Sequence, residues 1–140
     1  MVNYLDYAAT TPVHPEVLEV ITKEMSSFGN PSSVYRIGRE QKQKIERVRK
    51  AILKELQASP HDAIIFTSSG SEGNNLVFES IREHFAKEKG HIIVSAVEHP
   101  SVRKSAEFLA QEGFEVTYLA PNKEGSVEVS AVEKALREDT

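Results

Sequence analysis

The stretch HIIVSAVEHPSVRKSAEFLAQEGFEVTYL, residues 91–119, decides the fold class. An apolar run at residues 92–95 is typical of a strand that is covered on both faces. A helix is predicted over residues 100–111, because proline fits the first helical turn and Gly113 follows the last. Residues 115–119 predict a further strand. A strand, a helix and a strand in this order predict a parallel pair within an α/β fold.

The same order of elements occurs once more on the N-terminal side of this stretch. Residues 63–67 are a short apolar run with paired isoleucines, which predicts a buried strand. Small polar residues follow at 68–73, and apolar side chains including Leu76 and Ile81 then predict a helix that ends near Gly90. Together with the two strands above, the sequence predicts helices packed on a small, mainly parallel sheet of three strands.

Further helices are predicted at both ends of the chain. Pro15 opens an apolar pattern typical of a helix, and apolar residues three or four apart predict a long helix over residues 37–56. Ser130 and Glu133 have the spacing of a capping box, which predicts a last helix that starts there. Because the alternation then requires another strand after Thr140, we interpret the fold as interrupted at that point.

The composition excludes several classes of protein. The chain has 140 residues, of which 39% are hydrophobic, so one packed domain is expected. Its formal net charge of -4 argues against a general binder of nucleic acid or anionic membranes. It contains no cysteine, which excludes disulfides, zinc thiolate sites and a cysteine nucleophile within this chain. No apolar stretch approaches the roughly 20 residues of a membrane span, and the N-terminus does not resemble a signal peptide. A cytoplasmic location is expected.

The polar turn at residues 67–73 is the first candidate for chemistry. It lies between a predicted strand and a predicted helix, which is where open α/β sheets bind ligands. Its sequence, TSSGSEG, offers small residues, backbone N–H groups and serine hydroxyls to a phosphate, and the helix start adds partial positive charge. The alternative is an ordinary polar turn in which a serine caps the helix.

His99 is the second candidate, because it follows the strand at residues 92–95 and lies at the same end of the predicted sheet. A histidine there can stack on a ring or move a proton near neutral pH, and the alternative is a helix N-cap before Pro100. A basic segment is the third; it could dock an acidic partner or RNA, or it could be a solvated helix face. Its cationic residues are Arg36, Arg39, Lys42, Lys44, Arg47, Arg49, Lys50 and Lys54.

Several segments, taken in order, resemble the opening of NifS-like cysteine desulfurases, which belong to the class V aminotransferase group. These segments are YLDYAATTP (4–12), GNPSS (29–33), GR (38–39), FTSSGSEGNNL (66–76), EHP (98–100) and GFEVTYL (113–119). Three positions depart from the usual pattern, since Ser69 stands where the family usually has glycine, Ser71 where it usually has threonine, and Tyr35 where many members carry histidine. Serine at position 71 keeps the hydroxyl group that phosphate binding requires.

The resemblance implies a portion of the large domain of a fold type I transferase, with an N-terminal arm at residues 1–13 and the incomplete large domain at residues 14–140. It implies that Gly70 and Ser71 bind the phosphate of pyridoxal 5′-phosphate, and that His99 stacks on the cofactor ring and helps to move protons. Such enzymes remove sulfur from L-cysteine as an enzyme persulfide and release alanine. The sulfur passes to an acceptor protein for iron–sulfur cluster or thio-cofactor assembly.

The family's Schiff-base lysine, pyridine-facing aspartate, persulfide cysteine and substrate-binding arginine would all fall beyond residue 140. We therefore expect the chain alone to be inactive, and we expect self-association or a complementing C-terminal portion. Two alternatives stay open. One is another class V enzyme, such as a selenocysteine lyase, and the other is a non-catalytic module that binds a partner.

Overall fold

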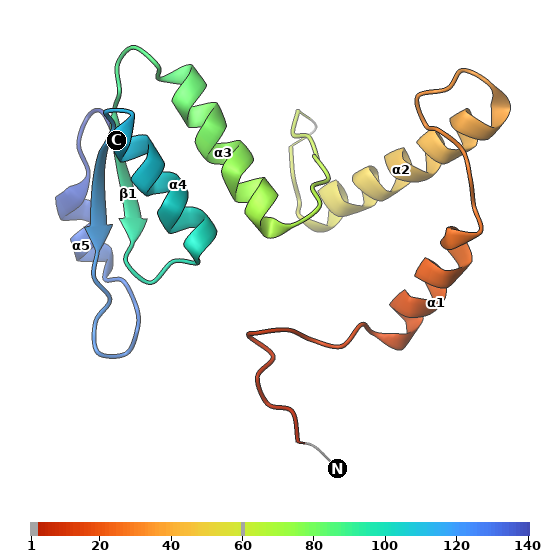
Figure 1. Ribbon diagram of the computed structural model, residues 1–140, viewed down its shortest axis with the longest axis horizontal. Helices are drawn as coiled ribbons and strands as arrows, with labels where there is room; N and C mark the ends of the chain where they lie inside the picture. Colours follow the sequence, from red (N-terminus) through yellow and green to blue (C-terminus); the bar gives the residue numbers. More distant parts are fainter. Residues whose placement is uncertain (1–2, 60) are drawn as a thin grey trace. The chain divides into compact units, whose positions relative to one another are not determined.

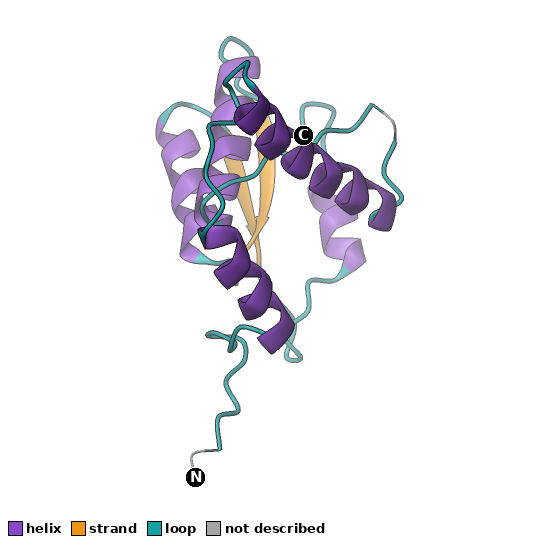
Figure 2. Ribbon diagram, turned by 90° about the vertical axis from the view of Figure 1, so that its right-hand side faces the viewer, coloured by secondary structure: helices purple, strands orange, loops and turns teal. Residues whose placement is uncertain are grey.

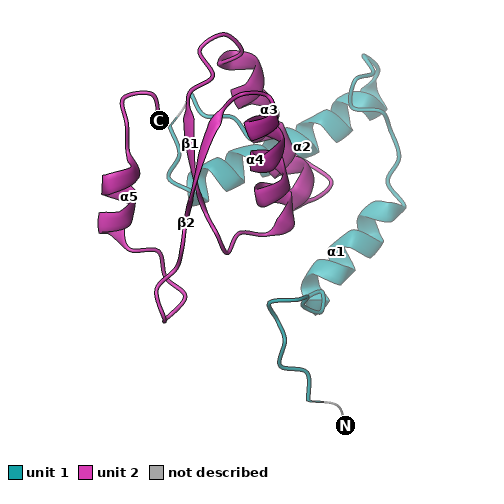
Figure 3. Cartoon of the chain, turned by 60° about the vertical axis from the view of Figure 1, so that its left-hand side comes forward, with its two compact units in different colours: residues 1–64 teal, residues 65–140 magenta. Residues whose placement is uncertain are grey.

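The computed structural model describes residues 3–59 and 61–140 of the chain (Figure 1). The chain divides into two compact units, Met1–Ile64 and Ile65–Thr140 (Figure 3). All of the buried hydrophobic side chains among the described residues belong to the second unit. That unit also contains the strands, and it carries the first two candidates for chemistry, residues 67–73 and His99, whereas the basic segment lies in the first unit.

The second unit is built on a parallel pair of strands, as the sequence predicts. Strand β1 (His91–Ser95) pairs with β2 (Glu115–Leu119), with His91 opposite Glu115 and Ser95 opposite Leu119. Helix α4 (Pro100–Gln111) connects the two strands and packs against both. Figure 2 shows the two strands side by side in orange. The β1–α4–β2 order therefore confirms the prediction from residues 91–119.

Two further helices complete this unit. Helix α3 (Gly70–His84) packs against α4, and α5 (Val129–Ala135) packs against β2. Figures 1 and 3 show α4 and α5 on opposite sides of the strand pair. The arrangement is an α/β layer structure in which helices cover a small parallel sheet, as expected.

A small apolar core lies between α4 and the strands. Its buried side chains are Val94, Ala106, Leu109 and Phe114. The turn from α4 into β2 positions the last of these, since the backbone N–H of Phe114 donates to the carbonyl of Leu109 at 3.0 Å. Gly113 makes that turn with a φ of 97°, a left-handed conformation that glycine adopts without steric cost.

The predicted strand at residues 63–67 is not a strand. In the described part of the chain, β1 and β2 form the only sheet, and residues 64–67 have no regular secondary structure. Ile65 is 69% exposed and Phe66 is 51% exposed, so the run is not buried either. An apolar composition is compatible with a strand, but a strand also requires hydrogen bonds to a neighbouring strand. The only strand pairing among the described residues is between β1 and β2, and it does not include residues 63–67. The prediction of three strands is therefore wrong.

Three predicted helix boundaries also differ from the structure, both ends of α3 and the start of α5. Helix α3 begins at Gly70, within the segment expected to be a turn, and it ends at His84, before Gly90. Helix α5 has Glu128 as its N-cap, so Ser130 lies inside the helix and does not form the predicted capping box. Glu128 takes the N-cap position instead, and its carboxylate accepts a hydrogen bond from the Asn122 side chain in the preceding turn.

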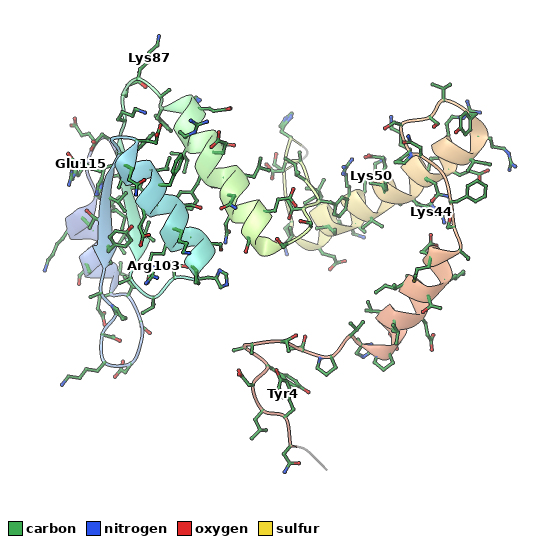
Figure 4. All side chains as sticks on the ribbon, in the orientation of Figure 1. Tyr4, Lys44, Lys50, Lys87, Arg103 and Glu115 are labelled. Carbon is green, nitrogen blue, oxygen red and sulfur yellow. The ribbon has the colours of Figure 1, made fainter. Side chains whose placement is uncertain are left out.

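The first unit consists of α1 (Pro15–Met25) and α2 (Arg36–Glu55), which agree with the predicted helices within one or two residues. Lys44 of α2 (Figure 4) reaches back to the end of α1, with its Nζ atom 2.6 Å from Oε2 of Glu24. The apolar side chains of α1 stay about half exposed. No helix among residues 3–59 and 61–140 is long and apolar enough to cross a membrane.

Candidate functional site

The turn that starts α3 is held by its own side chains. Ser69 has extended backbone angles and is the N-cap, and its Oγ accepts a hydrogen bond from the backbone N–H of Glu72 at 3.2 Å. The Glu72 carboxylate bonds in the opposite direction and accepts from the Ser68 backbone N–H at 2.5 Å and from the Ser68 hydroxyl at 2.6 Å. The Thr67 hydroxyl donates to the Ser69 carbonyl at 3.0 Å. These reciprocal bonds resemble a capping box and give the turn one defined shape.

This turn leaves donors for an anion. Glu72 and Gly73 donate their backbone N–H groups to Ser69, whereas those of Gly70 and Ser71 have no acceptor in the described parts of the chain. Helix α3 has 15 residues, so its N-terminus also carries the partial positive charge of a full helix. A Cβ atom added at Gly70 would meet nothing within 4 Å, which shows open space beside these donors. The turn therefore fits a phosphate group in both chemistry and space.

Glu72 supports the turn as a charged group. Hydrogen bonds from the hydroxyl and the backbone N–H of Ser68 hold the pKa of the Glu72 carboxyl below its ordinary value of 4.5. The carboxylate is consequently ionised at neutral pH, which favours its charge-assisted bonds to Ser68. It stabilises the turn through Ser68, and it leaves the N–H groups of Gly70 and Ser71 unused.

His99 lies at the N-terminus of α4, where its ring acts as the helix cap. The Nδ1 atom lies 3.1 Å from the backbone N of Ser101 and 2.8 Å from the Ser101 Oγ. The structure thus confirms the alternative that His99 is an N-cap. The ring is exposed, and its Nε2 atom has no bonding partner among the described residues, so a cap and a ligand contact are compatible.

A pocket between α3 and α4 brings the two candidate segments together. It has a volume of about 520 Å³, and Ser71 and His99 both line it. Gly70 does not line the pocket but immediately precedes Ser71. Apolar side chains such as Phe78 and Phe108 form part of the wall, and Lys104 adds a positive charge. A phosphate held by the turn and a flat ring near His99 can therefore occupy neighbouring parts of one site.

Sequence reasoning missed the polar contacts that join the two helices of this pocket. The Asn74 side chain donates to the Ser101 Oγ at 2.9 Å, and the Ser105 Oγ lies 2.8 Å from Oδ1 of Asn75. The two adjacent asparagines just after the polar turn could have indicated polar contacts, but their serine partners are 27 and 30 residues away in the sequence. In the part of the chain that the structure describes, no group of histidines and carboxylates has the arrangement of a metal site.

Comparisons with known proteins give one family match and several curated relatives. The family model described as aminotransferase class V matches residues 3–140. Cysteine desulfurase IscS from Dictyoglomus turgidum is 45% identical over 138 residues, and cysteine desulfurase IscS from Shewanella sediminis is 40% identical over an alignment of 141 positions. Each match covers 98% of this chain and 35% of the relative. The chain thus spans about a third of the length of these curated relatives.

Solved structures give the same result. SspA in complex with cysteine superposes with a TM-score of 0.90 at 39% sequence identity, covering 99% of this chain and 40% of that protein. A NifS-like protein superposes with a TM-score of 0.90 at 35% identity, covering 100% of this chain and 38% of that protein. These similarities confirm the predicted fold class, a portion of a fold type I transferase with helices on a small parallel sheet.

Proposed function

Because the chain belongs to the class V aminotransferase family, we propose that it forms the phosphate-binding and ring-stacking part of a pyridoxal-phosphate-dependent cysteine desulfurase. The observation that carries this proposal is the pocket that Ser71 and His99 share, next to the unused N–H groups of Gly70 and Ser71. Similarity to cysteine desulfurases over 98% of the chain supports the choice of reaction. The bound cofactor would supply an electron sink, which lets bonds at the amino-acid substrate break.

In this proposal each candidate residue has a distinct role. The backbone N–H groups of Gly70 and Ser71 and the Ser71 hydroxyl bind the cofactor phosphate, as a helix N-terminus does in other phosphate sites. The His99 ring covers the cofactor ring and moves a proton through its exposed nitrogen. Glu72 keeps the turn in its binding shape through Ser68. The substrate is L-cysteine, and the product is alanine.

The remaining chemistry needs groups that these 140 residues do not supply. The chain has no cysteine, so a persulfide cannot form on it. We propose that a complementing C-terminal portion supplies the sulfur-carrying cysteine and the lysine that links the cofactor, and that a second copy or this portion covers the exposed apolar residues. The location is proposed to be cytoplasmic, and the sulfur is passed to an acceptor protein. The arm at residues 1–13 and the large-domain part at residues 14–140 remain the proposed division of the sequence.

Titration with inorganic phosphate tests the anion site. The backbone amide signals of Ser69, Gly70 and Ser71 are followed by NMR in the full chain as phosphate is added to millimolar concentration. We expect these signals to shift together with one dissociation constant. Replacing Ser71 by alanine should weaken binding several-fold, and Ser80→Ala, further along the same helix, should not. Unchanged amide signals in a folded chain would contradict the proposal.

A further inference from the structure

We propose that Ser101 and Asn74 are positioning residues that hold the His99 ring in a single tautomer, with its hydrogen on Nε2. The functional importance of this tautomer rests on the proposed function of His99. Its physical basis is the hydrogen-bond chain that runs from Asn74 in α3 through Ser101 in α4 to Nδ1 of His99. The three residues come from the two helices that line the pocket.

The backbone N–H of Ser101 influences whether Nδ1 of His99 carries a hydrogen. A backbone N–H can only donate a hydrogen bond, and the N–H of Ser101 faces Nδ1 of His99 at 3.1 Å. This contact favours a lone pair on Nδ1, and the Ser101 side chain contributes separately. In a neutral imidazole one nitrogen carries the hydrogen and the other accepts, so the hydrogen lies on Nε2.

Asn74 sets the direction of the second bond to Nδ1. Its Nδ2 amide group can only donate, and it lies 2.9 Å from the Ser101 Oγ. The Ser101 oxygen is thus an acceptor for Asn74, and its own hydrogen is left to point at Nδ1 of His99, 2.8 Å away. Without Asn74 the hydroxyl could rotate and accept a hydrogen from Nδ1. Asn74 therefore favours the tautomer in which Nδ1 has none.

The hydrogen bonds from Asn74 through Ser101 to His99 also connect the polar turn of α3 with the histidine at the start of α4. Asn74 lies three residues after Ser71, one turn into α3, whereas His99 caps α4. Asn74 and Ser101 are both partly buried, so water competes less for these bonds than at an exposed position. As a result, the nitrogen that remains available, Nε2, has one defined role as a donor of a hydrogen bond or a proton to a ligand in the pocket.

Long-range ¹H–¹⁵N NMR spectra of the labelled full chain test this assignment, because the ring carbon-bound protons report both nitrogens. We expect His99 in its neutral form to show Nε2 protonated and Nδ1 unprotonated. In Ser101→Ala and Asn74→Ala the proportion of the other tautomer should rise by about fivefold, which is the factor that one net hydrogen bond contributes to an equilibrium. Ser101→Thr keeps a hydroxyl and should restore the original proportion.

Ser105→Ala is the control, because Ser105 lines the same pocket and its hydroxyl contacts Asn75 and the backbone carbonyl of Ser101, but it bonds neither to the Ser101 side chain nor to His99. It should leave the tautomer unchanged. A hydrogen on Nδ1 of the unmodified chain would overturn the proposal, and so would Ser101→Ala and Asn74→Ala spectra identical to that of the unmodified chain. The ring is observed without any ligand, so a failure here leaves the phosphate titration intact, and a failed titration leaves this result intact.

Discussion

The Oε2 atom of Glu72 lies within hydrogen-bond distance of both the backbone N and the hydroxyl of Ser68, at 2.5 and 2.6 Å. This contact closes the turn around Ser69, whose own hydroxyl caps α3 from inside the same turn. The acidic residue of the predicted phosphate-binding segment consequently has a structural role. It orders the donors without using the N–H groups that an anion requires.

The order of this turn should depend on pH through Glu72. The folded-state pKa of this carboxyl is lowered, so its contribution is fully present above 4.5 and is lost as the pH falls through the folded-state value. Amide hydrogen exchange at Ser68 and Glu72, whose N–H groups are bonded within the turn, should therefore accelerate relative to the helix interior as the pH falls below about 4.5. Glu72→Gln should show fast exchange already at neutral pH.

Glu83→Gln is the control for this measurement, because Glu83 lies in the last turn of the same helix, far along α3 from the capped turn. It should not change exchange at Ser68 or Glu72. If Glu72→Gln protected these amides as well as the unmodified chain does, the contact between Glu72 and Ser68 would not order the turn.

Replacing Gly73 by alanine should stabilise α3. Gly73 lies inside the helix, where glycine costs up to about 1 kcal/mol relative to alanine. A Cβ at this position would lie 3.6 Å from the Thr67 Oγ1, which is an ordinary contact, so the substitution fits without strain. Urea unfolding should show the free energy of unfolding increased by about 0.5–1 kcal/mol.

Gly38→Ala is the contrasting variant. There the added Cβ would lie 2.5 Å from the carbonyl oxygen of Asn30 and 2.7 Å from that of Ser33, and these backbone atoms cannot move away cheaply. It should disturb the loop before α2, seen as shifted amide signals of Asn30 and Ser33. A destabilised Gly73→Ala chain would show that α3 makes contacts near Gly73 that the structure does not contain.

His91 should contribute to the stability of the second unit. Its ring is only 3% exposed, and its two nitrogens bond to the hydroxyls of Thr117 and Thr140 at 2.7 and 2.9 Å. Removal of the ring in His91→Ala leaves both hydroxyls without this partner and opens a cavity beside β1. We expect a loss of about 2–3 kcal/mol in the free energy of unfolding. His14→Ala, at a position without a side-chain cap bond, should change it by less than about 0.5 kcal/mol.

The chain alone should not release sulfur from L-cysteine. It lacks the thiol that would accept the sulfur, and no lysine in it matches the family motif for the cofactor. Purified chain incubated with L-cysteine and pyridoxal 5′-phosphate should form no more alanine than the free cofactor does. Alanine formation above that level would contradict the division of roles proposed for this chain and its complementing portion.

The sequence predicted the β1–α4–β2 segment well because its information is local. Pro100 and Gly113 mark the ends of α4, and the apolar runs on either side pair with each other. The run at residues 63–67 was predicted wrongly for the opposite reason. Its composition suits a strand, but a strand also depends on a partner, and composition does not show one.

In the candidate site, too, local features could be predicted from the sequence, and contacts between distant segments could not. Residues 67–73 and His99 could be selected from motifs, and the Ser69 cap follows from local rules. The contact between Asn74 and Ser101 could not be predicted, because it depends on how α3 packs against α4 over 27 residues of sequence. Periodicity predicts that both helices exist, but it does not set which polar side chains meet between them.

In the proposed site, one ligand contacts both the turn at Gly70 and Ser71 and the ring of His99. Pyridoxine 5′-phosphate tests it most directly, since it carries the ring and the phosphate of the cofactor but has no aldehyde to react with surface lysines. We expect its addition to shift the Gly70 and Ser71 amides and the His99 ring signals in parallel, with one dissociation constant. Inorganic phosphate should shift only the amides, and pyridoxine without phosphate should shift neither at the same concentration. Ring signals of His99 that stay unchanged while the amides shift, or amides that do not respond at all, would contradict the account.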